Sequence, residues 1–242
     1  MPKSNSIIAA PLRQALFECF RSITRLVRPE LRRQTILVGG AASIAHSSVL
    51  VTEDVDVAAP PSALTDIWEG ISAGAPNLSF ESDGKIAFDA PGQDIRVRVD
   101  LLEIGNGCIE RIHVTVPFFE GSVASVSDLL RLRAVTVVDR GSDGEVEDFR
   151  WLLSRVASRG QLLPDLENEE LGCMRSAGES SLGRLDRLVL GAVLSANNWP
   201  LAYGVPFPHI LICNFNTNFG HITGFFIPCT SPAPNPPTKV SA

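Results

Sequence analysis

Residues 36 to 58 constrain the fold more than any other part of the chain. Three apolar residues, Ile36 to Val38, precede the glycine pair Gly39-Gly40, and a second apolar run begins at Asp54-Val55-Asp56. This order predicts a short buried strand, a tight turn, one or two helical turns over residues 41–46 and a second strand. Side chains alternate along a strand, so Asp54 and Asp56 are expected on one face, roughly 6.5 to 7 Å apart.

The residue types in this unit suit a hard cation and an anion. Two carboxylates on one face offer the oxygen ligands that Mg²⁺ prefers. Gly39 and Gly40 open a helix, and glycine lets backbone N–H groups come close to a bound anion. Each feature alone is commonplace, because Gly-Gly is often only a tight turn and Asp-x-Asp can simply end a strand. Their combination in this order points to phosphoryl or nucleotidyl chemistry.

Periodic apolar residues predict helices and strands on both sides of this unit. Residues 12–27 repeat apolar side chains every three or four positions, which predicts an amphipathic helix that ends before Pro29. Ser62 and Ser125 are the expected N-caps of two further helices. The remaining expected strands cover residues 78–80, 85–88, 95–102 and 109–116, and the remaining expected helices cover residues 63–71, 126–137, 146–160 and 182–194.

Composition favours a soluble protein inside the cell. The chain has 242 residues, of which 45% are hydrophobic and 20% are charged, and its formal net charge is −6. This excess of acidic residues does not indicate a broad basic surface that could bind nucleic acid. The 5 cysteines are scattered and form no C-x-x-C pair, which favours reduced thiols over disulfides or a zinc site. We expect no membrane span and no secretory signal, and therefore a cytoplasmic location.

Two groups of charged residues are interpreted as solvated helix faces. The first is a run of arginines that starts at Arg13 and ends at Arg33. We favour a solvated face over a binding patch there, because charged residues are common on the exposed side of an amphipathic helix. The second group is Glu145, Glu147 and Asp148, on a later helix. His46 is expected at a helix end or in a loop.

The chain is expected to divide into three parts. Residues 10–160 form the main domain. Residues 161–198 are a helical and partly disordered extension, because residues 161–180 are acidic and polar. Residues 199–242 contain 8 of the 17 prolines and one charged residue, Lys239, and show neither helical nor strand periodicity. That composition predicts a disordered C-terminal tail.

The motif at residues 38–56 resembles the signature of the nucleotidyltransferase superfamily of the DNA polymerase β type. That signature is an apolar residue, Gly-Gly or Gly-Ser, a spacer, Asp-x-Asp and a third acidic residue on a later strand. Here 13 residues separate Val38-Gly39-Gly40 from Asp54-Val55-Asp56, and Thr52 stands two positions before Asp54, as is usual in the family. The resemblance covers about residues 10 to 160. It implies an α+β domain with a mixed, mostly antiparallel sheet flanked by helices.

Within that superfamily, the chain looks closest to the small abortive-infection type members. The segments Asp128-Leu-Leu-Arg-Leu-Arg and Glu147-Asp148-Phe149 resemble their downstream helices. The resemblance implies transfer of a nucleoside monophosphate from an NTP to a hydroxyl acceptor, with Mg²⁺ or Mn²⁺ as cofactor. The acceptor would be a small molecule, a protein side chain or an RNA end.

The resemblance also implies roles for particular residues. Asp54, Asp56 and a third carboxylate would be the catalytic residues and the metal ligands. Asp100, on the alternating strand over residues 95–102, is preferred as the third carboxylate and would take the hydroxyl proton; Glu103 is the alternative.

A triphosphate site is implied next to these carboxylates. The backbone N–H groups of Gly39 and Gly40 would contact the nucleotide, and Ser43 would add a hydroxyl donor from the first helical turn. Arg96 and Arg98 share the expected face of Asp100, and we expect them to pair with carboxylates of the same site.

Two positions depart from the abortive-infection pattern. Those relatives usually carry a basic residue where this chain has Leu50, and lysines in two downstream helices where it has Arg133 and Gly144. Leu50 and Gly144 bring no positive charge to a phosphate. This departure favours an alternative, a catalytically silent nucleotide- or partner-binding module on the same fold. A dinucleotide-binding fold fits poorly, because the Gly-x-Gly-x-x-Gly spacing is missing.

Overall fold

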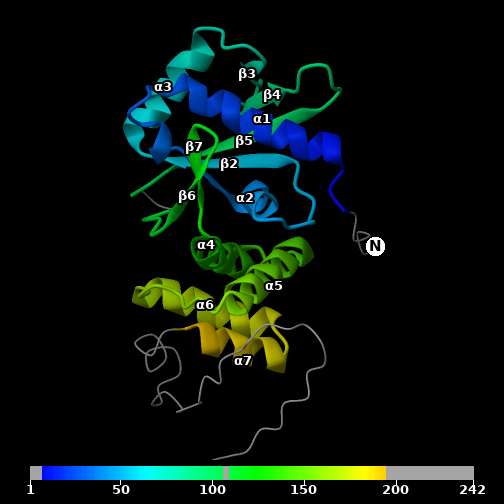
Figure 1. The fold of residues 1–242 in the computed structure, drawn as a ribbon, viewed down its shortest axis with the longest axis vertical. Coiled ribbons are helices and arrows are strands. Elements are labelled where there is room, and N and C mark those ends of the chain that lie inside the picture. The colour runs from blue at the N-terminus through cyan, green and yellow to red at the C-terminus, as the bar shows by residue number, and fades with distance from the viewer. Residues whose placement is uncertain (1–6, 106–108, 195–242) are drawn as a thin grey trace, which may run out of the picture. The chain divides into compact units, whose positions relative to one another are not determined.

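The computed structural model describes residues 7–105 and 109–194 of the chain (Figure 1). The predicted tail at residues 199–242 lies outside the described residues. The helices are α1 (Ala10–Leu26), α2 (Gly39–Ala45), α3 (Pro61–Ser72), α4 (Val126–Asp139), α5 (Asp143–Ser158), α6 (Asn168–Ser181) and α7 (Arg184–Val193), with a short 3-10 helix at Arg32–Gln34. The strands are β1 (Ile36–Val38), β2 (Asp54–Ala59), β3 (Leu78–Phe80), β4 (Ile86–Asp89), β5 (Arg96–Glu103), β6 (Thr115–Phe118) and β7 (Gly121–Ala124).

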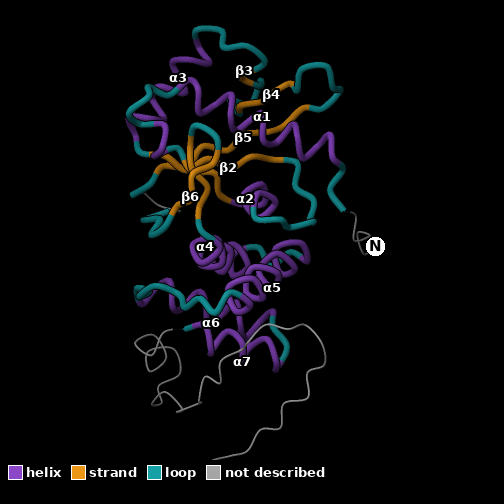
Figure 2. The backbone as a smooth tube through the Cα atoms, in the orientation of Figure 1, coloured by secondary structure: helices purple, strands orange, loops and turns teal. Residues whose placement is uncertain are grey.

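The described strands form one mixed sheet in the order β3-β4-β5-β2-β1-β7-β6 (Figure 2). The pairs β2–β5 and β1–β7 are parallel, whereas β1–β2, β3–β4, β4–β5 and β6–β7 are antiparallel. The predicted α+β class and the mostly antiparallel sheet are therefore confirmed. The catalytic candidates lie on β2 and β5, which are neighbours near the middle of the sheet.

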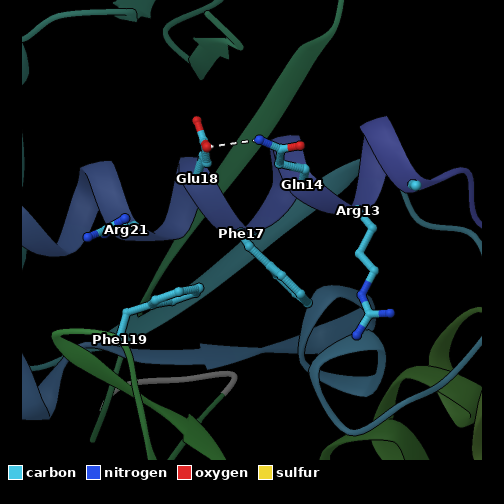
Figure 3. Close-up of a pocket in the computed structure, with 7 residues that line it drawn as sticks. Arg13, Gln14, Phe17, Glu18, Arg21 and Phe119 are labelled. Atoms are coloured by element: carbon cyan, nitrogen blue, oxygen red, sulfur yellow. Dashed lines mark hydrogen bonds between the residues drawn. The ribbon is translucent and has the colours of Figure 1, made fainter.

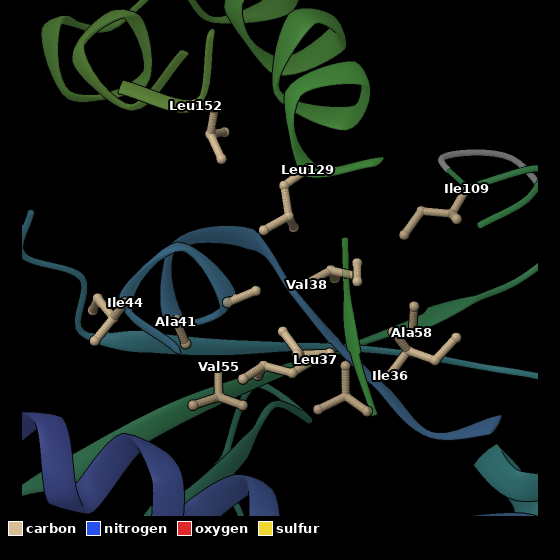
Figure 4. Packing of buried hydrophobic residues seen from close by; sticks show 14 of the residues in the cluster. Ile36, Leu37, Val38, Ala41, Ile44, Val55, Ala58, Ile109, Leu129 and Leu152 are labelled. Carbon is tan, nitrogen blue, oxygen red and sulfur yellow. The ribbon is translucent and has the colours of Figure 1, made fainter. Parts of the chain in front are cut away.

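Helices cover both faces of the sheet (Figure 1). The helices α1 and α3 pack on one face, against β2 and β5, and α2 packs on the other. The helices α4 and α5 contact α2, and α6 and α7 pack against them in turn. Leu129 of α4 and Leu152 of α5 point toward α2 and β1, while Val55 of β2 lies on the opposite side (Figure 4). The core is thus continuous from the sheet into the C-terminal helices. Each helix in the described residues is too short or too polar to cross a lipid bilayer.

Most arginines of α1 and the turn after it are exposed, as predicted for a solvated face, and two of them also connect elements. Arg28 donates to both carboxylate oxygens of Asp66 in α3, at 2.8 and 2.6 Å. Arg25 donates to Glu120 in the β6–β7 turn at 3.0 Å. These exposed pairs are individually weak, but they fix where α1 lies relative to both partners.

The stretch between β5 and α4 differs from the prediction. A single strand over residues 109–116 was expected to end at Pro117. Instead, Ile109 forms only an isolated bridge with Ile104, and Pro117 lies inside β6, opposite Ser122 of β7. Strand β6 is at the edge of the sheet, where a residue without an N–H group costs no ladder hydrogen bond. The small residues of β7 concealed this hairpin in the sequence.

Two further predictions were wrong in detail. Residues 161–180 were expected to be loosely ordered, but α6 forms in this segment. Although most of the segment is polar, Leu171, Met174 and Ala177 lie on one face of the helix, and that face is buried. Ser62 was expected to cap α3, but the helix already begins at Pro61, whose fixed φ suits a first helical position. The predicted cap of α4 is confirmed, since Ser125 Oγ accepts from the backbone N–H of Asp128 at 3.1 Å.

Candidate metal and nucleotide site

Three carboxylates meet on the face of the sheet that α2 covers. Strands β2 and β5 run parallel with Asp56 beside Asp100 and Asp54 beside Arg98. One oxygen from each of Asp54, Asp56 and Asp100 lies within 4.8 Å of the other two. Asp54 and Asp56 are half-buried, whereas Asp100 is exposed. The three carboxylates therefore converge as predicted, and Asp100 forms the side of the cluster that faces solvent.

The glycine pair lies against the same carboxylates because β1 pairs with β2. Val38 is opposite Asp56, so the chain turns into α2 directly above that side chain. Gly39 has a φ of +64°, and a Cβ atom there would lie 1.8 Å from Asp56 Oδ2. A Cβ atom at Gly40 would lie 2.8 Å from the Thr52 side chain. Glycine is required at both positions by close approach, and at Gly39 also by the left-handed backbone.

Thr52 connects the loop before β2 to the acidic cluster. Its hydroxyl donates to Asp54 Oδ1. The bond holds one carboxylate oxygen of Asp54 and orients the side chain. The Thr-x-Asp spacing noted in the sequence thus has a local structural reason.

The crowding of the carboxylates changes the acidity of Asp56. Burial, followed by the negative charges of Asp54 and Asp100, raises the pKa of Asp56 to about 7. The positive charges of Arg133 and Arg140 act in the opposite direction. Ionising a buried carboxyl group beside two other carboxylates is unfavourable unless a bound cation offsets the negative charge. The donor set therefore fits a hard divalent cation.

The raised pKa of Asp56 predicts a pH-dependent stability in metal-free buffer. Between about pH 4 and about pH 7, folded Asp56 holds a proton that the unfolded chain has released, because its pKa rises from 3.8 to about 7 on folding. The folded state therefore loses stability as the pH rises through this window, on the order of 4 kcal/mol from this group over the whole window and on the order of 2–3 kcal/mol between pH 5 and pH 8. Urea unfolding at pH 5 and pH 8 measures the effect.

The matched control for this measurement is Asp56→Asn, which cannot titrate. The fall in unfolding free energy from pH 5 to pH 8 should be smaller in Asp56→Asn than in the wild type. An equal fall in both proteins would show that other groups cause it.

Behind the glycine turn lies a buried cluster that sequence reasoning missed. Asp148 of α5 is buried; its Oδ2 accepts from Ser43 Oγ at 3.1 Å and lies 2.8 Å from Arg133 Nη2. Burial raises the pKa of Asp148, against the opposing effects of Arg133 and Ser43. Asp148 Oδ1 accepts no hydrogen bond from the described residues. This cluster ties α2, α4 and α5 together and holds Arg133 where its charge acts on Asp56.

Two predictions change because of this cluster. Asp148 was expected on a solvated helix face, but it is buried and paired. Ser43 was expected to donate to a phosphate, but its buried hydroxyl donates to Asp148 instead. Ser43 therefore serves to anchor α2. Asp148 lies four residues before the buried Leu152 and therefore on the same face of α5, and that spacing was the available signal.

The other candidate residues lie away from the carboxylates. Glu103 pairs with Ala59 at the far end of β5 and is outside the cluster. Arg96 was expected to pair within the site, but it bonds to Glu81 and Asp89 near the β3 edge of the sheet. His46, at the end of α2 as predicted, has Nε2 2.8 Å from the carbonyl oxygen of Ala124.

The structure also shows the surroundings of Leu50 and Gly144, the two neutral residues that depart from the abortive-infection pattern. Leu50 is half-buried in the loop before β2, and its backbone N–H donates to Ser48 Oγ at 3.2 Å. Gly144 is exposed in the first turn of α5, with open space where a Cβ atom would lie. Neither position supplies a charge, whereas Arg133 and Arg140 at α4 do.

The fold was compared with known proteins. No family model matches the chain, and no curated protein matches its sequence. Among solved structures it is similar to an antigenic nucleotidyltransferase-like protein from Paracoccidioides brasiliensis, at 13% sequence identity and a TM-score of 0.56, over 82% of this chain and 100% of that chain. It also aligns with JHP933 from Helicobacter pylori, at 9% identity and a TM-score of 0.46, over 81% of this chain and 93% of that chain. The first likeness shows a nucleotidyltransferase-like fold, as predicted; the abortive-infection subgroup stays a prediction.

Proposed function

We propose that this chain, with its nucleotidyltransferase-like fold, transfers a nucleoside monophosphate from an NTP to a hydroxyl acceptor with Mg²⁺ as cofactor. The observation that carries the proposal is the convergence of Asp54, Asp56 and Asp100 within 4.8 Å of one another, beside a bare glycine backbone. Exposed acidic groups are common without a metal. Here, however, one of the three is largely desolvated and is pressed against a glycine that no other residue could replace.

Asp54, Asp56 and Asp100 would hold the divalent cations. Bound there, such cations neutralise the triphosphate and lower the pKa of an acceptor hydroxyl. Asp100 is the exposed member, so an incoming acceptor reaches its carboxylate first. That position suits Asp100 to accept the hydroxyl proton.

The remaining residues would bind and orient the nucleotide. The first backbone N–H groups of α2, at Gly39 and Gly40, have no partner within the helix and suit a phosphate oxygen. Arg133 and Arg140 would add positive charge from the α4 side, whereas Leu50 and Gly144 add none. Positioning and charge neutralisation carry most of the catalysis in phosphoryl transfer, so no covalent nucleophile is needed.

A labelling experiment tests the proposal. Wild-type protein and the Asp54→Asn/Asp56→Asn variant are incubated with each α-³²P-labelled NTP and Mg²⁺ or Mn²⁺, and with cell extract as a source of acceptors. The wild type should transfer label to protein, RNA or a small molecule, and the variant should not. A thermal unfolding curve confirms that the variant folds. Equal labelling by both proteins would contradict the proposal.

The second candidate function is a catalytically silent nucleotide-binding module. The neutral residues Leu50 and Gly144 favour it, because they leave the triphosphate with fewer positive charges than in the abortive-infection relatives. Calorimetric titration with NTP and Mg²⁺ separates the two functions. Metal-dependent binding that is lost in Asp54→Asn/Asp56→Asn, without transfer to any acceptor, would establish the silent module.

A further inference from the structure

A second concave surface lies on the α1 side of the sheet, which is the face opposite the acidic cluster. It is a shallow, open pocket of about 330 Å³ between the exposed face of α1 and the β6–β7 turn. The pocket is lined by Ala10, Arg13, Gln14, Phe17, Glu18 and Arg21 of α1 and by Phe119 of the turn. Figure 3 shows the Phe17 ring between the side chains of Arg13 and Phe119, all below the axis of α1 in that view.

Aromatic rings and arginines alternate along this pocket. The ring centroids of Phe17 and Phe119 are 6.4 Å apart. The guanidinium of Arg13 lies 5.5 Å from the Phe17 centroid, and that of Arg21 lies 5.7 Å from the Phe119 centroid. Aromatic residues and arginine are the types enriched at the centre of protein interfaces, where they combine apolar area with directional charge.

Phe119 is exposed to solvent and has an unfavourable backbone conformation. Phe119 is 46% exposed and has a φ of +51°, a conformation that a bulky side chain rarely adopts. Arg33 holds the turn by donating to the carbonyl oxygens of Phe119 and Gly121. A strained backbone that keeps a large apolar ring in water indicates a use for that ring outside the folding of the domain.

The charges around the pocket are positive at two points and interrupted between them. In the described part of the chain, Arg13 forms no ion pair; Arg21 lies 3.5 Å from Glu120, which Arg25 approaches more closely. Glu18 stands between the two arginines along α1, but it projects on the other side of the helix from Phe17 and Phe119, together with Gln14, from which it accepts at 3.2 Å (Figure 3). The side of the pocket that carries the rings therefore has two separate positive charges. Two separated carboxylates match these charges better than the continuous row of phosphates of a nucleic acid.

We propose that this pocket binds an extended acidic peptide segment of a partner protein, with an aromatic residue between two carboxylates. Arg13 and Arg21 are 8 residues apart on α1, which corresponds to about 12 Å along the helix axis. Positions i and i+4 of an extended peptide are about 13 Å apart, and i, i+2 and i+4 share one face. A segment of the form acidic–x–aromatic–x–acidic therefore places its carboxylates at Arg13 and Arg21 and its aromatic ring against the Phe17–Phe119 pair.

Fluorescence anisotropy with labelled pentapeptides tests this proposal. The probe is fluorescein-labelled Glu-Ser-Phe-Ser-Glu with an amidated C-terminus, at low ionic strength. The register control is Ser-Glu-Phe-Glu-Ser, which has the same composition but places its carboxylates two positions apart. The charge control is Lys-Ser-Phe-Ser-Lys, and a labelled five-nucleotide oligouridylate represents nucleic acid. The probe should bind at least about tenfold more tightly than each of these three, as expected for a pair of matched charges.

Protein variants locate the binding on this pocket. Arg13→Glu/Arg21→Glu should lower the affinity for the probe at least about tenfold. Lys85→Glu/Arg184→Glu makes the same change in net charge at two exposed residues elsewhere and should leave the affinity unchanged. Phe119→Asn removes the ring but suits the left-handed backbone, so the protein should keep its thermal stability while losing the probe.

Several results would overturn the proposal. These are no measurable binding of the probe, equal binding of the register control, tighter binding of the oligouridylate, or equal losses in the two double variants. Because the pocket and the carboxylates lie on opposite faces of the sheet, Arg13→Glu/Arg21→Glu should keep the NTP-labelling activity of the wild type. Failure of the peptide proposal and failure of the proposed enzymatic function are thus separate outcomes.

Discussion

Replacing Asp100 by asparagine is expected to reduce metal-dependent nucleotidyl transfer by about a hundred- to a thousandfold and to leave the fold intact. Asp100 supplies the exposed oxygen of the three-carboxylate cluster and lies beside Asp56 on the neighbouring parallel strand. Asparagine keeps the shape of the side chain but removes its negative charge, so it weakens cation binding and cannot accept the hydroxyl proton. The rate of label transfer from NTP at saturating Mg²⁺ measures the loss.

The matched control is Glu103→Gln on the same strand. Glu103 lies three residues further along β5, opposite Ala59 and outside the acidic cluster, so its neutral variant should keep full activity. The Asp100→Asn protein should also unfold at the same or a higher temperature in metal-free buffer, because one of three mutually repelling carboxylates has been neutralised. Full turnover by Asp100→Asn together with loss in Glu103→Gln would transfer the role to Glu103.

Replacing Gly39 by alanine is expected to reduce nucleotidyl transfer as strongly as Asp100→Asn does and to destabilise the protein. The new Cβ atom would lie 1.8 Å from Asp56 Oδ2, so Asp56 or the turn must move. The backbone φ of +64° adds a conformational cost of about 1–2 kcal/mol for any residue with a Cβ atom. Urea unfolding should therefore show a loss of at least about 1–2 kcal/mol. Label transfer should fall to the level of the Asp100→Asn protein, since Asp56 is displaced from its two partners.

Gly144→Ala provides the control for a change from glycine to alanine. Gly144 lies in the first turn of α5 with nothing within 4 Å of the added Cβ atom. Alanine there should stabilise the protein by roughly 0.4–1 kcal/mol, because it restricts the unfolded chain without any clash. Nucleotidyl transfer should stay unchanged in this variant. A Gly39→Ala protein with wild-type activity would show that the Gly39–Asp56 contact has no role in the site.

The elements that carry their own periodic signal were predictable. The helix α1 repeats buried residues three and four apart, and β5 alternates buried Val97 and Val99 with exposed Arg98 and Asp100. The order of β1, the glycine pair and β2 was equally readable, because each depends on neighbours within a few residues. The hairpin β6–β7 was missed for the opposite reason: the pairing of Pro117 with Ser122 is visible only once β7 adds to β1.

The candidate site divides in the same way. Asp54 and Asp56 share a face through strand alternation alone, and the tight turn at Gly39-Gly40 follows from the glycine pair, so the sequence by itself determined these parts. Only the tertiary structure placed Asp100 beside Asp56, buried Asp148 against Ser43 and Arg133, and brought Phe119 to the exposed face of α1. Those contacts join residues from different strands and helices. They depend on strand order, register and helix packing, which side-chain periodicity within one segment does not encode.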